Sequence, residues 1–142
     1  MVIDGGFHEV SGVDLPGILA EAARRGVPVF TLSTAGRTDK EAFFRAVRET
    51  LPLDPPLGTC RMVWDALADS VWGGLHGLKS PRAVIVWPDA RPAAGAESSE
   101  SAAGDFRIAL DILRDVATSL ADLRHTGGRP TRVAVYLAAP DE

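Results

Sequence analysis

Three short apolar runs, each rich in branched side chains, constrain the fold of this chain more than any other feature. The runs read VPVFTL (27–32), AVIVW (83–87) and RVAVYL (132–137). Hydrophobic side chains are nearly continuous along each run, which is typical of strands covered on both faces of a sheet. Helical patterns separate the runs. We therefore expect an α/β fold with a small three-stranded parallel sheet and flanking crossover helices.

Amphipathic patterns predict helices around these strands. One helix is expected over residues 38–51, because it opens with the capping-box pattern Thr-Asp-Lys-Glu and closes at prolines. A longer helix is expected from near Asp105, with an apolar stripe at helical spacing that extends to Leu123. A short helix over residues 15–25 precedes the first strand and forms an N-terminal helical extension.

A further crossover helix is expected from Arg61 to Val71 or Trp72. A hydrophobic side chain recurs there at every fourth position, which gives the helix one apolar face. Gly73 and Gly74 follow directly, and glycines at this place predict the end of the helix.

The composition along the chain predicts its organisation. We expect an N-terminal extension over residues 1–26 and one domain over residues 27–142. Residues 88–104 consist mainly of Ala, Pro, Gly, Ser and Glu, so they predict a mobile surface loop within that domain. The chain has a single cysteine, Cys60, and no leader-like or membrane-spanning apolar run, so a cytoplasmic protein is expected.

Charge and motif spacing disfavour several classes of function. The chain has 15 basic and 19 acidic side chains and a net charge of −4, which disfavours direct nucleic-acid binding. The three histidines lie far apart and no zinc-ligand spacing occurs, so we expect no metal and no cofactor. No serine stands in a nucleophile elbow, and the stretch 74–80 lacks the spacing of a phosphate-binding loop. No catalytic residue is predicted, and we expect a protein that is not an enzyme.

An acidic pair is the most informative feature of the helix that begins near Arg61. Asp65 and Asp69 are four residues apart, so both lie on one face, away from the apolar stripe. Like charges at this spacing destabilise an isolated helix by ~0.2–0.5 kcal/mol, so folding alone does not favour the pair. Asp65 has a structural alternative, because the helix dipole favours an anion near the N-terminus and Arg61 could pair with it.

The segment DALAD (65–69), followed by Gly73, resembles the second helix of the barstar family, whose members are intracellular inhibitors of secreted microbial ribonucleases. Val84, Ile85 and Trp87 are similar to the middle strand of that family. The resemblance spans roughly residues 27–137 and implies a partner that is a small basic ribonuclease or a related nuclease toxin. In such a complex carboxylates take the place of RNA phosphates in the basic active site.

By that resemblance Asp69 is the expected central anchor, with Asp65 and Asp115 beside it. Trp64 is a further candidate contact, because tryptophans are favoured at interfaces, although core packing is expected for at least one of Trp64 and Trp72.

The chain departs from the family pattern in the segment before the acidic helix. Residues 57–63 read LGTCRMV and lack the aromatic residue and the asparagine that family members commonly carry there. Two alternatives therefore stay open beside inhibition of a ribonuclease. One is a barstar-like interaction module that binds another protein, and the other is a small hydrolase that uses the same acids.

Overall fold

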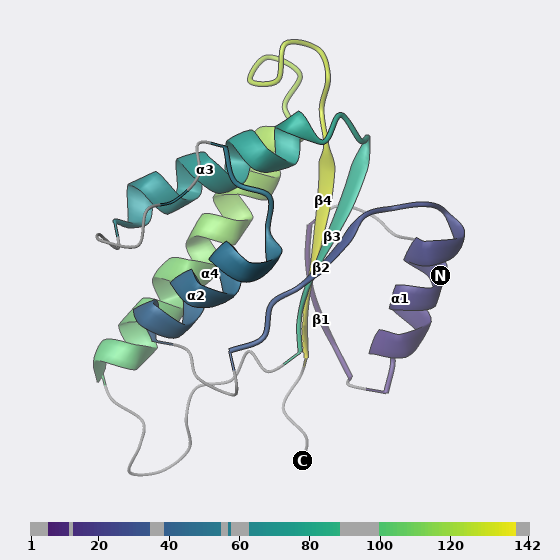
Figure 1. The fold of residues 1–142 in the computed structure, drawn as a ribbon. Coiled ribbons are helices and arrows are strands. Elements are labelled where there is room, and N and C mark those ends of the chain that lie inside the picture. Colours follow the sequence, from purple (N-terminus) through teal and green to yellow (C-terminus); the bar gives the residue numbers. More distant parts are fainter. Residues whose placement is uncertain are drawn as a thin grey trace.

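The computed structural model describes residues 6–11, 13–34, 39–54, 57, 63–88 and 100–138. The elements in chain order are β1 (Gly6–Val10), α1 (Leu15–Arg24), β2 (Val29–Thr31), α2 (Lys40–Thr50), α3 (Trp64–Gly77), β3 (Arg82–Trp87), α4 (Glu100–Leu120) and β4 (Arg132–Ala138). The strands form one parallel sheet in the order β1-β4-β3-β2. This arrangement confirms the predicted α/β fold with a parallel sheet and flanking helices (Figure 1).

The number of strands is corrected by the structure, which has four strands where the sequence predicts three. The additional strand, β1, pairs with β4 from Gly6 opposite Ala134 to Val10 opposite Ala138. β1 lies at an edge of the sheet and includes the exposed Glu9, so it lacks the continuous apolar run of a central strand. Such an edge strand is held by backbone hydrogen bonds to a single neighbouring strand. These bonds require no particular side chains, so the amino-acid pattern does not predict the strand.

Both faces of the sheet are covered, as the apolar runs predict. α1 packs on one face, and α2, α3 and α4 pack on the other (Figure 1). A hydrophobic core lies on each face of the sheet, and the residues of β3 alternate between the two cores. Val84 and Val86 pack in the core beneath α1, whereas Ile85 and Trp87 pack in the core beneath the other three helices. This double coverage explains why the strands are hydrophobic at nearly every position.

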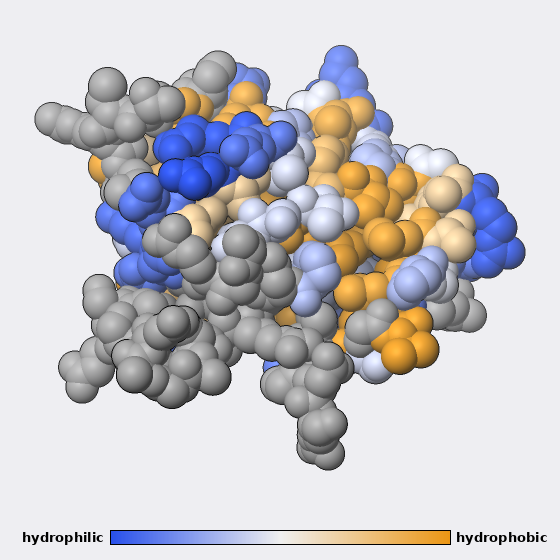
Figure 2. All heavy atoms as spheres, turned by 60° about the horizontal axis from the view of Figure 1, so that its bottom comes forward, coloured by the Kyte–Doolittle hydropathy of each residue, from blue (hydrophilic) through white to orange (hydrophobic). Residues whose placement is uncertain are grey.

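The molecular surface reflects the unequal coverage of the two faces. Seen from the lower end of Figure 1, hydrophilic side chains gather on the side of α2, α3 and α4 (Figure 2). Apolar surface is more extensive on the side of the sheet and α1, where a single helix covers the sheet (Figure 2).

The N-terminus of α2 is capped differently from the prediction. The N-cap is Asp39, whose carboxylate accepts a hydrogen bond from the Ala42 amide at 3.3 Å, and residue 38 lies outside the described residues. A second acid completes the cap from a distance, because the Lys40 amide donates to Oδ2 of Asp105 on α4 at 2.9 Å. The cap therefore also fixes α2 against α4.

The bounds of α4 also differ from the prediction. The helix begins at Glu100, more than one turn before Asp105, and the remainder of the predicted loop beyond Pro88 lies outside the described residues. The helix ends at Leu120, so Leu123 does not continue the buried stripe and is 61% exposed.

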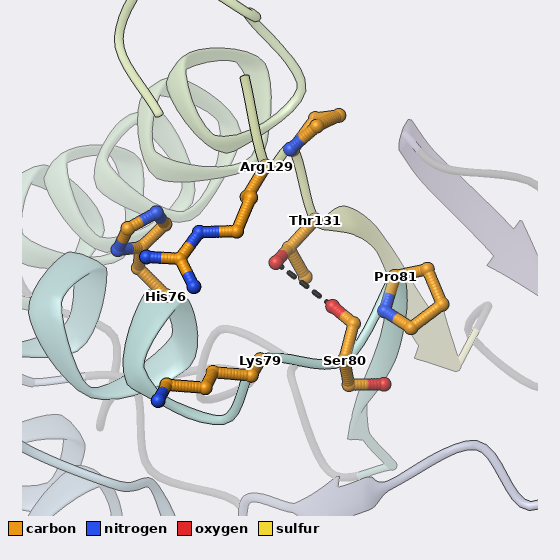
Figure 3. Close-up of a pocket in the computed structure, with 7 residues that line it drawn as sticks. His76, Lys79, Ser80, Pro81, Arg129 and Thr131 are labelled. Atoms are coloured by element: carbon orange, nitrogen blue, oxygen red, sulfur yellow. Dashed lines mark hydrogen bonds between the residues drawn. The ribbon is translucent and has the colours of Figure 1, made fainter. Parts of the chain in front are cut away.

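Hydrogen bonds join the starts of β3 and β4. The Thr131 hydroxyl donates to the Ser80 carbonyl at 3.0 Å (Figure 3). The Arg132 amide donates to the Pro81 carbonyl at 2.9 Å. The two segments that enter the sheet here are therefore held at a constant spacing.

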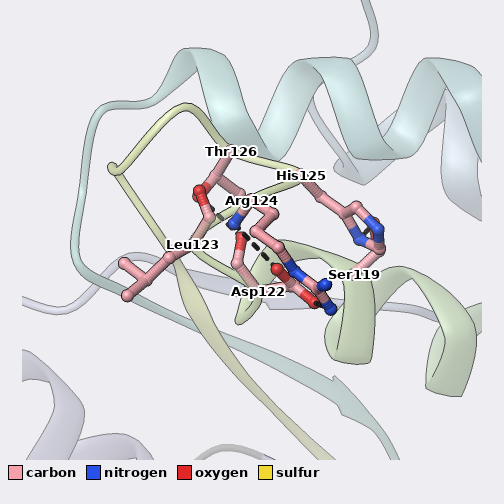
Figure 4. Close-up of polar contacts among 6 residues, drawn as sticks. All are labelled: Ser119, Asp122, Leu123, Arg124, His125 and Thr126. Carbon is pink, nitrogen blue, oxygen red and sulfur yellow. Dashed lines mark hydrogen bonds and ion pairs between the residues drawn. The ribbon is translucent and has the colours of Figure 1, made fainter.

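The turn between α4 and β4 carries its own hydrogen-bond network (Figure 4). Asp122 accepts from the Arg124 amide at 2.8 Å and lies 3.5 Å from the Arg124 guanidinium. The Thr126 hydroxyl donates to the Asp122 carbonyl at 2.9 Å. The backbone hydrogen bond from Arg124 is the main cause that lowers the pKa of the Asp122 carboxyl below its ordinary value.

This lowered pKa predicts a specific acid sensitivity. A carboxyl whose pKa is depressed by folding stabilises the protein above its unfolded pKa and loses that contribution as the pH falls through its folded pKa. We expect Asp122→Asn to flatten the fall in the free energy of unfolding as the pH drops through and below 3.8, the ordinary pKa of this carboxyl. Urea unfolding at several pH values measures this, and parallel curves for the two proteins would contradict it.

Candidate protein-binding site

α3 presents one face to the core and the opposite face to solvent. Leu67, Val71 and Leu75 are completely buried in the core between the sheet and the helices. Val63, which the sequence places on the same stripe, is instead the N-cap and is 45% exposed. The predicted start at Arg61 lies outside the described residues, and the buried stripe extends one turn further along the chain than expected.

The prediction that Gly73 and Gly74 end this helix is wrong, because α3 continues to Gly77. A Cβ atom on Gly73 would collide with the Asp54 carbonyl oxygen, and one on Gly74 would collide with the Pro52 carbonyl oxygen. The glycines thus allow the chain that follows α2 to cross directly over α3. The Asp54 amide donates to the Ser70 carbonyl at 3.0 Å and holds this crossing in place.

Asp65 and Asp69 both lie on the exposed face of α3. Within the part of the chain that the structure describes, neither carboxylate makes an ion pair or a hydrogen bond. Arg61, the alternative partner of Asp65, lies outside the described residues. Two negative charges therefore stand on a rigid helix with their hydrogen-bonding capacity unused by the described residues.

Asp54 is an acid that the sequence analysis did not identify as a site residue. Its backbone lies against Gly73 and bonds the Ser70 carbonyl, next to Asp69, and the residue is exposed. The only sequence signal for this proximity is the glycine pair, because adjacent glycines within a helix can mark close approach of another backbone.

Asp115 lies on α4 and is also exposed. The contact between α3 and α4 includes a hydrogen bond from Nε1 of Trp72 to Oγ of Ser119 at 3.0 Å. Asp69 precedes Trp72 by three residues and Asp115 precedes Ser119 by four. Each of these two acids therefore lies within about one helical turn of the same contact between the two helices.

Trp64 has a packing role at the start of α3. Its ring lies edge-on to Phe44, with ring centroids 5.2 Å apart, and it also contacts Phe43. Nζ of Lys40 lies 5.4 Å from the centroid of the Trp64 ring, which is within the range of a cation–π contact. The residue is half-buried, so part of its surface stays accessible beside the acidic face. A partner contact through Trp64 stays a prediction.

The described residues show neither a metal site nor a membrane span. No group of three or more His, Cys, Asp or Glu side chains among them is placed to hold a metal ion. No helix in the described ranges combines the length and the apolar character that crossing a membrane requires.

A parallel sheet with three helices on one face and one on the other defines a small α/β class, and comparison with known families identifies it further. The model of a family described as Barstar (barnase inhibitor) matches residues 27–135. The chain therefore belongs to the barstar family. The match begins after β1 and α1, so these elements lie outside it. Comparisons with curated proteins and with solved structures give no match.

Proposed function

We propose that this protein inhibits a ribonuclease by placing Asp65 and Asp69 in the basic active site of that enzyme. The observation that carries the proposal is that both carboxylates are exposed and form no ion pair with the described residues, in a member of a family described as inhibitors of barnase. A ribonuclease cleft must present Lys, Arg and His donors to RNA phosphates. Two carboxylates on a rigid helix can accept hydrogen bonds from the same donors.

The structure of α3 favours this use of the acids. Its buried face and the crossing held by Gly73 and Gly74 fix the helix against the core, so the acids need little further ordering on binding. The acids also have no described internal ion pair that would have to break first. The entropic cost of ordering these side chains on association is therefore smaller than it would be for carboxylates on a mobile loop.

Other residues extend the proposed interface. Asp115 contributes from α4, and Asp54 contributes from the segment that crosses α3. Trp64 supplies an apolar contact at the start of the helix. We propose no catalytic activity, cofactor or direct nucleic-acid contact for this surface, and we place the protein in the cytoplasm as an immunity protein that protects the cell producing the nuclease.

The test is a titration of small basic ribonucleases, barnase included, with the purified protein. We expect stoichiometric loss of nuclease activity. Nuclease activity that persists across the panel at saturating protein would contradict the proposal. Capture of a partner without nuclease activity would then support the alternative interaction module, and turnover of a substrate by the protein alone would support the hydrolase.

The dependence of association on salt provides a second measurement. The Debye length falls from ~10 Å at 0.1 M to ~3 Å at 1 M ionic strength, so steering by exposed carboxylates weakens as salt rises. We expect the association rate constant to fall over this range while the dissociation rate constant changes less. Stopped-flow mixing measures both constants. An association rate that does not change with salt would be inconsistent with steering by Asp65 and Asp69.

A further inference from the structure

A small hollow lies where α3 ends and where β3 and β4 begin (Figure 3). Its volume is about 220 Å³, and two stretches that are far apart in the sequence, residues 76–81 and 129–131, line it. α3 contributes His76, the turn into β3 contributes Lys79 and Ser80, and the segment before β4 contributes Arg129 and Thr131.

The hollow is lined by two cationic side chains, Lys79 and Arg129, for which the described residues supply no acidic partner. Figure 3 shows the guanidinium of Arg129 next to the ring of His76, and the side chain of Lys79 separate from this pair, below it in this view. Neither Lys79 nor Arg129 forms an ion pair with any residue that the structure describes. Two like charges that line one hollow repel each other, and an anion between them would convert that repulsion into attraction.

A neighbouring hollow of about 310 Å³ provides a contrast on the other side of Ser80 and Pro81. It is lined by Arg25 among others, but Nε of Arg25 lies 2.7 Å from Oε1 of Glu21. The charge of that arginine is thus already compensated within the protein. Arg82, the other cation that lines the second hollow, also has an interaction within the protein.

The walls of the first hollow are held in place by hydrogen bonds. Nε2 of His76 donates to the Thr126 carbonyl at 3.2 Å, which joins α3 to the turn that carries Arg129. The Thr131 hydroxyl donates to the Ser80 carbonyl on the opposite wall. Thr126 and Thr131 are both buried. The cations therefore extend from a rigid frame rather than from mobile ends of the chain.

The backbone at Lys79 gives independent support for a role of this side chain. Lys79 has φ of 55° and is the only non-glycine residue of the described ranges in the left-handed region. It directly follows the C-cap of α3, a position where glycine is usual because a side chain is strained there. The helix dipole would favour one cation at this end, but it does not account for the second cation that arrives from the turn before β4.

From this juxtaposition of Lys79 and Arg129 in a rigid hollow, we propose that the site binds a phosphate group, either as inorganic phosphate or as a phosphate monoester. Arginine and lysine are the side chains that most often hold phosphate oxygens. The volume is below the ~300–1,000 Å³ of pockets that enclose drug-sized ligands, so a single phosphate group fits the hollow better than a whole nucleotide.

The test compares thermal unfolding in sodium phosphate and in sodium chloride of equal ionic strength. We expect the wild-type Tm to rise by roughly 3–6 °C once phosphate exceeds its Kd about tenfold. Phosphate also stabilises folded proteins without binding them, so the contribution of the site is the difference between the wild type and Arg129→Gln. Arg107→Gln, which removes an exposed cation from the distant half of α4, is the matched control and should respond like the wild type.

A second variant separates anion binding from a purely structural role. Lys79→Gly relieves the left-handed strain, so its Tm without phosphate should equal or exceed that of the wild type, while its response to phosphate should be lost. A lower Tm with an unchanged response would overturn the proposal, as would equal responses of the wild type, Arg129→Gln and Arg107→Gln. Glycerol phosphate at the same concentration distinguishes a phosphate monoester from inorganic phosphate as the ligand. A larger rise in Tm with glycerol phosphate than with inorganic phosphate identifies the monoester.

Discussion

Replacing Asp69 by alanine is expected to weaken nuclease binding roughly 30- to 5,000-fold in Kd, which corresponds to ~2–5 kcal/mol. In the proposed complex Asp69 meets cations of the nuclease in a desolvated cleft, and its loss leaves those cations buried without a partner. Most of the change should appear in the dissociation rate, because the contact forms after the encounter. Surface plasmon resonance with the wild type and the variant measures both rate constants.

Matched variants isolate the charge of Asp69. Asp69→Asn keeps the size of the side chain and should lose a large part of the affinity as well. Glu49→Ala removes an exposed acid of α2 that is not among the proposed interface residues, and it should bind like the wild type. All three variants should unfold within about 0.5 kcal/mol of the wild type, because these acids lie on the surface. Equal affinity of Asp69→Ala and Glu49→Ala would exclude Asp69 as the anchor.

Replacing Gly74 by alanine is expected to destabilise the fold by ~3 kcal/mol or more. The new Cβ would occupy the position of the Pro52 carbonyl oxygen, and backbone cannot give way as the end of a flexible side chain can. Either α3 or the crossing segment must move, and both border the buried core. Urea unfolding of the two proteins measures the loss as a shift of the midpoint with a similar slope.

The same helix supplies the control for this prediction. Gly77 has no atom within 4 Å of the place where its Cβ would lie. Gly77→Ala should therefore stabilise the protein by roughly 0.5–1 kcal/mol, since alanine loses less backbone entropy than glycine in a helix. Identical substitutions three residues apart are thus expected to have opposite signs. A Gly74→Ala protein as stable as the wild type would contradict the close crossing over α3.

Side-chain patterns in the sequence were sufficient to predict three of the four strands and the positions of most helices. β2, β3 and β4 lie within the apolar runs or within one residue of them, because burial on two faces requires continuous hydrophobic side chains. α1 and α2 follow their amphipathic patterns for the same reason. The exposure of Asp65 and Asp69 also follows from local spacing, since both are opposite the apolar stripe of one helix.

Contacts between distant segments decided what these patterns could not. β1 joins the sheet through backbone pairing with β4, which local sequence does not indicate. Gly73 and Gly74 signal the close approach of another backbone, but local sequence does not identify the crossing segment some twenty positions earlier. The convergence of Lys79 with Arg129, and of Asp54 with α3, likewise depends on how the segments pack. The sequence by itself determined most of the buried side chains, Val63 and Leu123 excepted, and which helix carries the acidic pair. Only the tertiary structure decided which charges meet, because that depends on distances through space rather than along the chain.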